Sequence, residues 1–335
     1  MTTDRPPLLQ VRDLFKLFPY RSRQFWRAEN SFVHAVDGVS FDLMPGEVLG
    51  LVGESGCGKS TLALTLMGLE QPTAGTITFA GQEITRLGRK EMKAIRRRIQ
   101  IVFQDPYEAL NPLMTVGEIV AEPLKVHGLY PDRQEREARV QQALLDAGLN
   151  PAEIFLDRYP HQLSGGQRQR VVIAGALVLD PILLLADEPV SMLDVSIRAE
   201  ILTLLADLRD RRGISILFIT HDLSTAAFFT DRVAVMYLGR IVEIGPTRTV
   251  LQDPRHPYTR SLLSVVPVPN PRLRRERMIL QGETPNAVHV PAGCRFHPRC
   301  PVAIAACQAQ DPELAPVNPG HQVACLLAGR LNPVE

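Results

Sequence analysis

Tryptophan, net charge of one sign and long apolar runs are all scarce in this chain of 335 residues. It has a single tryptophan, and its 37 basic residues are matched by 36 acidic ones. Balanced charge gives no general attraction for nucleic acid or an anionic membrane. No apolar run approaches the roughly 20 residues that cross a bilayer, and the opening Met-Thr-Thr-Asp-Arg-Pro-Pro lacks the apolar core of a secretory signal. We therefore expect a protein kept in the cytoplasm, without a nucleic-acid partner.

Cysteine is also absent from most of the chain, since four of the five cysteines lie beyond residue 293. In the cytoplasm such cysteines are expected to be reduced thiols or ligands rather than disulfides. The apolar fraction of 45% and the charged fraction of 22% are typical of a globular protein. The length exceeds one typical core, so two domains are expected.

One glycine-rich stretch has the pattern of a phosphate-binding loop. It lies between an apolar run at 48–52 and a second apolar-rich segment at 62–67. That strand, loop and helix order is the context that the pattern G-x-x-x-x-G-K-[ST] requires, and it argues against a plain glycine turn. Backbone N–H groups and the helix dipole bind phosphate, while Lys59 reaches the terminal phosphates and Ser60 helps to hold Mg²⁺. The candidate nucleotide-binding residues are Gly53, Glu54, Ser55, Gly56, Cys57, Gly58, Lys59, Ser60 and Thr61.

A second anion-binding element is formed by Ser164, Gly165, Gly166 and Gln167, which precede a helix predicted at 171–179. A serine and two glycines at a helix start again direct N–H groups toward an anion. Because the chain has only one phosphate loop, this element is expected to contact a nucleotide held by another subunit.

Two carboxylates, Asp187 and Glu188, follow the apolar run 182–186, which suits a buried parallel strand. Open α/β sheets place ligand groups at this end of their strands. Asp187 is expected to hold Mg²⁺ through water, and Glu188 to orient or deprotonate the attacking water. His221 lies just after the next predicted strand, 214–219, and could contact the γ-phosphate there.

The remaining pattern predicts an antiparallel sheet, a helical insert and a closing hairpin. Alternating apolar residues at 8–18 and 35–43 indicate two strands, and 75–79 and 98–103 indicate two more. Helical spacing at 116–124 and 134–149 predicts an insert that lasts to about residue 163. A helix is predicted at 196–212 and a hairpin at 233–244. An aromatic of the first sheet could stack on adenine: Phe18 is the first candidate, followed by Tyr20 and Phe32, and a purely structural role is the alternative for each.

Taken in order, these segments resemble the ATP-binding subunit of an ABC transporter. Gly53–Thr61 resembles the Walker A loop, Gln104 the Q-loop, Leu163–Gln167 the LSGGQ signature, Ile182–Glu188 Walker B, Ser191–Asp194 the D-loop and His221 the switch histidine. The resemblance implies an α/β fold: a P-loop (RecA-like) core at 1–250 with an antiparallel β subdomain and a helical subdomain at about 104–165, plus a small loop-rich C-terminal domain at 251–335. It implies Mg²⁺ at Ser60, Gln104 and Asp187, and catalysis by Glu188, His221 and Gln104.

Three stretches resemble more specifically the ATPases of oligopeptide and dipeptide importers: 103–112, 256–263 and 291–301. Val190 and Met192 depart from that family near the D-loop, and 19–32 matches it poorly. The resemblance implies ATP-driven peptide import at the cytoplasmic face of the membrane. It also implies a related but distinct second ATPase, two permease subunits and, indirectly, an extracytoplasmic binding protein. Import of nickel, glutathione or a glycoside is the alternative. A non-transport cassette ATPase is disfavoured because the chain has one signature and only about a hundred residues between Walker A and that signature, too few for a long coiled coil.

Cys294, Cys300, Cys307 and Cys325 are separated by five, six and seventeen residues, which is not the C-x₂-C spacing of zinc ribbons. A loop-rich segment without its own core needs a staple. The resemblance implies a [4Fe–4S] cluster at these residues, with zinc as the second choice and four unliganded thiols as the third. Cys57 is expected to be only a small residue of the phosphate loop.

Overall fold

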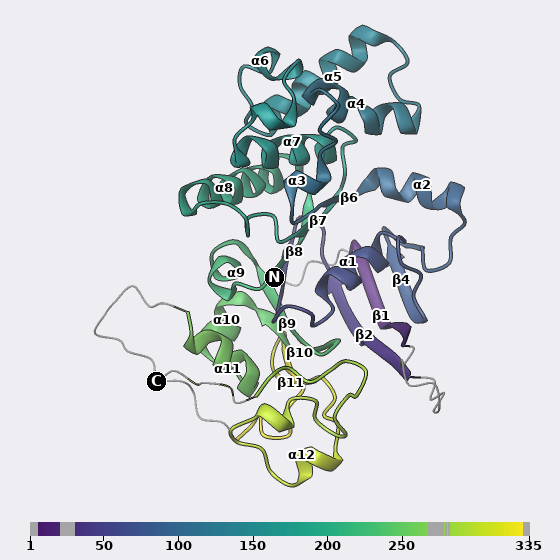
Figure 1. Cartoon of the computed structure of the whole chain (residues 1–335). Coiled ribbons are helices and arrows are strands. Elements are labelled where there is room, and N and C mark those ends of the chain that lie inside the picture. The colour runs from purple at the N-terminus through teal and green to yellow at the C-terminus, as the bar shows by residue number, and fades with distance from the viewer. Residues whose placement is uncertain (1–5, 21–30, 267–277, 279, 281, 331–335) are drawn as a thin grey trace. The chain divides into compact units, whose positions relative to one another are not determined.

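The computed structural model describes residues 6–20, 31–266, 278, 280 and 282–330. The chain forms two compact units, and each is assembled from separate stretches of sequence (Figure 1). Unit 1 contains Met1–Leu43, Val48–Thr85 and Thr220–Glu335, and unit 2 contains Met44–Glu47 and Arg86–Ile219. The phosphate loop therefore lies in unit 1, and the carboxylate pair and signature lie in unit 2.

Unit 1 contains a four-stranded antiparallel sheet in the order β2-β1-β4-β5. Its strands are β1 (Leu9–Tyr20), β2 (Ser31–Leu43), β4 (Ala74–Phe79) and β5 (Gln82–Glu83). On β1 the alternation predicted from the sequence buries Leu9 and Val11 completely, and a register shift precedes the buried Leu14. The antiparallel sheet predicted at 8–18 and 35–43 is confirmed, and both strands extend further than predicted.

The other strands of unit 1 run in the order β11-β12-β10-β9-β3. They are β3 (Val48–Val52), β9 (Arg232–Tyr237), β10 (Arg240–Pro246), β11 (Ala315–Asn318) and β12 (His321–Val323). The pair β3 and β9 is parallel, and the others are antiparallel. The C-terminal segment thus adds two strands beside the predicted hairpin β9–β10. The helices of unit 1 are α1 (Lys59–Leu66), α9 (Leu223–Phe229), α10 (Thr247–Gln252), α11 (Pro257–Ser264), η2 (His297–Arg299) and α12 (Ala306–Ala309).

An aromatic cluster joins the C-terminal segment to the hairpin within unit 1. Tyr237 of β9, Tyr258 of α11 and Phe296 are each at most 1% exposed. The ring centroids of Tyr237 and Tyr258 lie 4.7 Å apart, and Phe296 meets the Tyr237 ring edge-on at 5.2 Å. Such pairs stabilise beyond the area that they bury. The loop-rich segment therefore packs on the hairpin through large rings rather than through a core of its own.

Unit 2 is built on three parallel strands in the order β8-β7-β6, namely β6 (Ile99–Val102), β7 (Leu183–Asp187) and β8 (Ser215–Thr220). Every residue of β7 and β8 is buried, as continuous apolar runs predict. The helices of unit 2 are α2 (Arg89–Arg98), α3 (Pro106–Ala109), α4 (Val116–His127), α5 (Arg133–Asp146), α6 (Glu153–Leu156), η1 (Pro160–Gln162), α7 (Gly165–Leu177) and α8 (Val195–Arg212). Helices α4, α5 and α7 contact one another and form the helical insert (Figure 1).

The ends of the helices in unit 2 follow local capping chemistry. Thr115 and Glu118 form a reciprocal capping box at the start of α4, and Gly128 ends that helix in the left-handed conformation. Gly213 ends α8 in the same way, as its position in the sequence predicts. None of the helices in the described part of the chain is both long and apolar enough to cross a membrane.

Candidate nucleotide-binding site

The phosphate loop connects β3 to α1 and passes close to two other backbone segments of unit 1. A Cβ atom at Gly53 would lie 2.2 Å from the carbonyl oxygen of Met236. At Gly58, where φ is +106°, a Cβ atom would lie 1.9 Å from the carbonyl oxygen of Ala35. Only glycine, which has no Cβ atom, fits where another backbone carbonyl comes this close. The conformation of the loop is therefore set by its packing against β2 and β9, before any ligand binds.

Lys59 is buried at the first position of α1 and extends back across the loop. Its Nζ donates to the carbonyl oxygens of Gly53 at 2.7 Å and Glu54 at 2.9 Å. It also lies 3.7 Å from the Sγ of Cys57, a thiol whose pKa is raised by burial, so this thiol stays protonated. Ser60, the next residue, is exposed. The loop thus presents a fixed ammonium group and an accessible hydroxyl group, which suits phosphate and Mg²⁺.

Glu54 of the loop is held by residues of the C-terminal segment, none of which the motifs predict as site residues. Arg299 donates to both carboxylate oxygens, at 2.8 and 3.2 Å, and the Thr284 hydroxyl donates at 2.7 Å. The backbone N–H of Glu54 donates to the Tyr258 hydroxyl oxygen at 2.8 Å. The only available signal in the sequence was that Arg299 and Tyr258 fall within stretches that resemble the importer ATPases.

In unit 2, the structure brings Gln104 and Glu188 into contact. Gln104 follows β6, Glu188 follows β7, and the Gln104 Nε2 donates to the Glu188 Oε2 at 3.1 Å. Asp187, at the end of β7, is only 8% exposed. Glu188 has a φ of +47°, a left-handed conformation that costs a non-glycine residue about 1–3 kcal/mol and is frequent at functional sites. Its carbonyl oxygen accepts from the backbone N–H of Ser191 at 3.2 Å and from the hydroxyl at 3.1 Å.

The signature residues begin α7, six residues earlier than the helix predicted at 171–179. Ser164 Oγ accepts from the Gln167 N–H at 3.3 Å, and Gln167 Oε1 accepts from the Ser164 N–H at 3.0 Å. This capping box starts the helix at Gly165, whereas the prediction placed the glycines before the helix and began it at residue 171. A Cβ atom at Gly166 would lie 2.6 Å from the Cγ2 of Ile197 on α8, so close helix packing also requires glycine there.

The other predicted residues lie in unit 1. His221 is exposed between β8 and α9, and Asp222 next to it caps α9. Phe18 is half-buried on β1, with the Lys16 Nζ 4.6 Å from its ring centroid. Tyr20 and Phe32 are exposed nearby on the β1–β2 ribbon. The adenine-stacking role of Phe18 stays a prediction.

The four C-terminal cysteines are free thiols that lie within electrostatic range of one another. Burial, together with smaller contributions from the other three cysteines, raises the pKa of Cys294 to about 11. The backbone N–H of Cys294 donates to the Cys307 carbonyl oxygen at 2.8 Å. Among the described residues, however, no group of three or more His, Cys, Asp or Glu side chains could hold a metal ion. The geometry of the described residues therefore gives no support to the predicted [4Fe–4S] cluster or to zinc at these cysteines.

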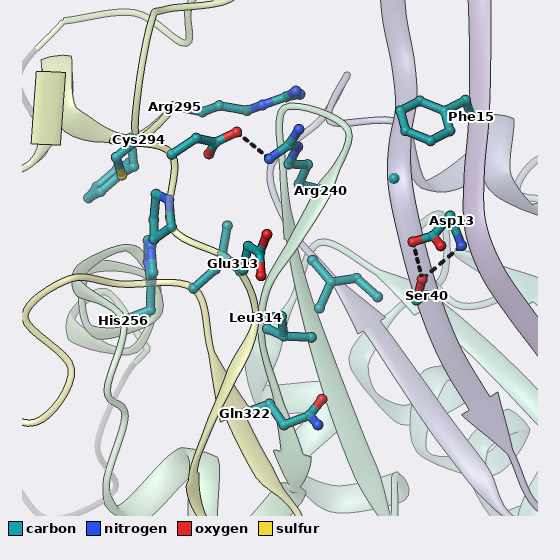
Figure 2. Close-up of a pocket in the computed structure, with 17 residues that line it drawn as sticks. Asp13, Phe15, Ser40, Arg240, His256, Cys294, Arg295, Glu313, Leu314 and Gln322 are labelled. Carbon is teal, nitrogen blue, oxygen red and sulfur yellow. Dashed lines mark hydrogen bonds and ion pairs between the residues drawn. The ribbon is translucent and has the colours of Figure 1, made fainter. Parts of the chain in front are cut away.

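A cavity of about 520 Å³ lies next to Cys294 in unit 1. Figure 2 shows Cys294 and His256 on one side of it and Asp13 with Ser40 on the other. Arginines and acidic residues both line it, and Arg240 pairs with Asp311 there. None of the residues of the phosphate loop is among its lining residues. This cavity is therefore separate from the nucleotide site.

Two family profiles match the chain. The profile described as "ABC transporter" matches residues 36–191, which contain the phosphate loop, the signature and the carboxylate pair. The profile described as "Oligopeptide/dipeptide transporter, C-terminal region" matches residues 242–307, which contain three of the four C-terminal cysteines.

Curated relatives match over nearly the whole chain. The oligopeptide transport ATP-binding protein AppF of Bacillus subtilis (strain 168) is 49% identical over 323 residues, which are 96% of this chain and 97% of AppF. The putative oligopeptide transport ATP-binding protein YkfD of the same organism is 47% identical over 325 residues, 96% of each chain.

Solved structures match about seven-tenths of the chain. A dimeric, post-hydrolysis structure of the ATP-binding cassette MJ0796 with ADP and Pi has a TM-score of 0.62 and 32% identity, and covers 72% of this chain and 99% of that one. The protein cbiO1 of Clostridium perfringens, part of the ABC transporter complex cbiONQ, also has a TM-score of 0.62 and 32% identity, over 73% of this chain and 91% of that one.

The fold and the site define this chain as an ABC-type ATPase. Within that class, it belongs to the family of ATP-binding subunits of oligopeptide and dipeptide importers. The α/β fold class and the family predicted from the sequence are confirmed.

Proposed function

We propose that this chain hydrolyses ATP to power the import of oligopeptides through a membrane transporter. The observation that carries the proposal is the match over 96% of the chain to relatives named as oligopeptide transport ATP-binding proteins, extending through the C-terminal region. Membership of this family implies membrane permease partners and paired ATPase cassettes. The chain would act as a peripheral subunit at the cytoplasmic face of the membrane.

In the proposed mechanism, Lys59 binds the terminal phosphates while Mg²⁺ is held by Ser60, Gln104 and Asp187. Hydroxyl, amide and carboxylate oxygens are the ligands that Mg²⁺ prefers. Gln104 can offer its amide oxygen because its amide nitrogen donates to Glu188. The ion would neutralise charge that develops on the transferred phosphoryl group.

Glu188 is the proposed general base, with His221 as a contact for the γ-phosphate. The contact between Gln104 and Glu188 supports this role because it holds the Glu188 carboxylate in a defined orientation. Ser164, Gly166 and Gln167 would complete the nucleotide site of the partner cassette. The side chains of Ser164 and Gln167 already form the N-terminal cap of α7, so the N–H groups of that helix start have a defined direction.

Replacing Glu188 by Gln tests the chemistry directly. The variant should bind ATP normally because the amide keeps the size of the side chain, while turnover should fall by roughly 10²–10⁴. Nucleotide affinity and steady-state phosphate release measure the two effects. The matched control is Glu200→Gln, which removes an exposed carboxylate that pairs with Arg170 at 2.9 Å in the same unit. Near-normal turnover of Glu188→Gln would assign the base to another residue.

The second ATPase is proposed to be a related but distinct chain rather than a second copy, and a binding protein outside the membrane is proposed to deliver the cargo. Nickel, glutathione or a glycoside remains the alternative cargo. Cells that lack this chain should lose uptake of a labelled tetrapeptide and regain it with the wild-type chain but not with Glu188→Gln. Loss of nickel, glutathione or glycoside uptake with intact peptide uptake would select the alternative. Mass spectrometry of the purified complex gives the identity of the second ATPase.

We further propose a [4Fe–4S] cluster at Cys294, Cys300, Cys307 and Cys325, with zinc as the alternative. Support comes from the position of these four thiols in one segment that lacks a core of its own, where the Cys294 N–H donates to the Cys307 carbonyl oxygen at 2.8 Å. The four thiolates of these cysteines would be the ligands of the cluster. When bound, it would staple the segment.

Iron, acid-labile sulfide and zinc, measured per chain on protein purified without oxygen, decide the metal. The proposal predicts about four irons with matching sulfide and their loss in Cys300→Ser. Zinc alone, or no metal, would contradict it.

A further inference from the structure

Each polar group of Glu54 in the phosphate loop is bonded within unit 1. Its backbone carbonyl accepts from the Lys59 Nζ at 2.9 Å, and its backbone N–H donates to the Tyr258 hydroxyl at 2.8 Å. Its carboxylate accepts from Arg299 and Thr284. Three of these four partners lie in the C-terminal segment, more than 200 residues away in the sequence. The N–H and carboxylate of Glu54 are therefore held by the C-terminal segment, in addition to the packing of the loop against β2 and β9.

The bond between Arg299 and Glu54 has the geometry of a strong ion pair. It is bidentate, at 2.8 and 3.2 Å, and a guanidinium group matches a carboxylate in this arrangement. The side chain of Arg299 is 9% exposed and that of Glu54 is 27% exposed, so solvent screens the pair less than a surface pair. Burial alone would raise the pKa of Glu54, but the bonds from Arg299 and Thr284 hold it below its usual value, so the carboxylate stays charged.

Arg299 is itself held rigidly. It ends the short helix η2, where its backbone N–H donates to the Phe296 carbonyl oxygen at 3.0 Å. Its guanidinium carbon lies 5.9 Å from the centroid of the Tyr237 ring. Phe296 is anchored in turn against Tyr237 and Tyr258. A side chain positioned this well can transmit the position of the C-terminal segment to the loop.

We propose that Arg299 is a positioning residue for nucleotide binding, which fixes Glu54 and thereby the loop carbonyls that orient Lys59. The Nζ of Lys59 bonds to the carbonyl oxygens of Gly53 and Glu54, so a shift of Glu54 moves the ammonium group that binds phosphate. Small displacements of a positioned group are costly for binding and reaction. The proposal requires only a nucleotide site in this loop, and it is independent of the cargo.

The test compares Arg299→Met with Arg299→Lys in the full chain. Arg299→Met keeps much of the apolar stem and should weaken ATP affinity about 10-fold, as expected for a coupled buried pair, with kcat changed less than about 2-fold. The ATP affinity of Arg299→Lys should lie between those of the wild-type chain and Arg299→Met, because lysine keeps the charge but loses the bidentate contact. The matched control is Arg240→Met, which removes the pair with Asp311 between β10 and the C-terminal segment and leaves ATP affinity unchanged.

A double-mutant cycle with Glu54→Gln separates positioning from folding. Once Arg299 is Met, the further loss of the Glu54 charge should change ATP affinity little, because the two groups act through one contact. Additive effects would overturn the proposal, as would unchanged ATP affinity in Arg299→Met. A loss of affinity in Arg240→Met equal to that in Arg299→Met would also overturn it. Affinity is read by equilibrium binding of ATP, so this test does not depend on turnover or transport.

Discussion

At the scale of single residues, Asp37 on β2 is a nearly buried charge outside the nucleotide site. It is 5% exposed and accepts from Arg295 at 2.5 Å and from His34 at 2.7 Å. Burial by itself would raise the pKa of Asp37, but the Arg295 and His34 bonds lower it below the usual value of 3.8. Its charged form therefore stabilises unit 1.

We predict that Asp37→Asn destabilises the chain by about 3–5 kcal/mol at neutral pH, because Arg295 then stays buried without its charge partner. A lowered folded-state pKa means that the stabilisation is complete above the unfolded value and is lost as the pH falls through the folded value. The wild-type free energy of unfolding should thus fall more steeply than that of Asp37→Asn below about pH 4. Denaturant titrations across this range measure both slopes, and parallel curves would contradict the assignment.

The sequence predicts single site residues where a short local pattern contains them. Lys59, Asp187, Glu188 and Gln104 each belong to a short motif, and the structure places Gln104 beside Glu188. Arg299 could not be predicted in this way. It is 245 residues from Glu54, and the contact depends on how the C-terminal segment folds onto β9.

At the scale of elements, the packing of α7 on α8 explains a glycine of the signature independently of nucleotide. In Gly166→Ala the new methyl group would meet the Ile197 Cγ2 at 2.6 Å, and overpacking of this kind costs about 1–3 kcal/mol. Ile197→Ala removes that atom, so the double variant should be more stable than the sum of the single variants predicts. Thermal unfolding measures the difference.

The matched control for this prediction lies in the same helix. A Cβ atom at Gly175 meets nothing within 4 Å, so Gly175→Ala should stabilise α7 by up to about 1 kcal/mol. If Gly175→Ala destabilises the chain, or if Ile197→Ala does not reduce the destabilisation caused by Gly166→Ala, the prediction is contradicted. The contact with the Ile197 Cγ2 would then not be the reason that α7 requires glycine at position 166.

Strands and caps were predictable from the sequence, whereas one helix start was not. Apolar alternation and continuous apolar runs correctly predicted β1, β3, β7 and β8, because a strand's environment is encoded in its own side chains. The start of α7 was predicted six residues too late, because the helix was expected to begin only after the glycines of the signature. The side chains of Ser164 and Gln167 form a capping box that offsets the low helix propensity of glycine.

At the scale of the whole molecule, the compact units are not contiguous in sequence. Unit 1 takes residues from both ends of the chain, so linear composition alone could not reveal it. The proposed domain boundary at residue 250 lies between β10 and β12 in the sequence, yet these two strands pair with each other in one sheet of unit 1. Glu243 of β10 is fully buried and bonds to His321 of β12 at 2.8 Å, which ties the C-terminal segment to the hairpin.

ATP-dependent accumulation of a labelled peptide in sealed vesicles tests the central claim most directly. The vesicles should contain the complete transporter, with this subunit on the side supplied with ATP. The account predicts accumulation with the wild-type chain, none with Glu188→Gln, and unchanged accumulation with Glu200→Gln. Equal peptide accumulation with the wild-type chain and Glu188→Gln would contradict the claim that ATP hydrolysis at this site powers peptide import.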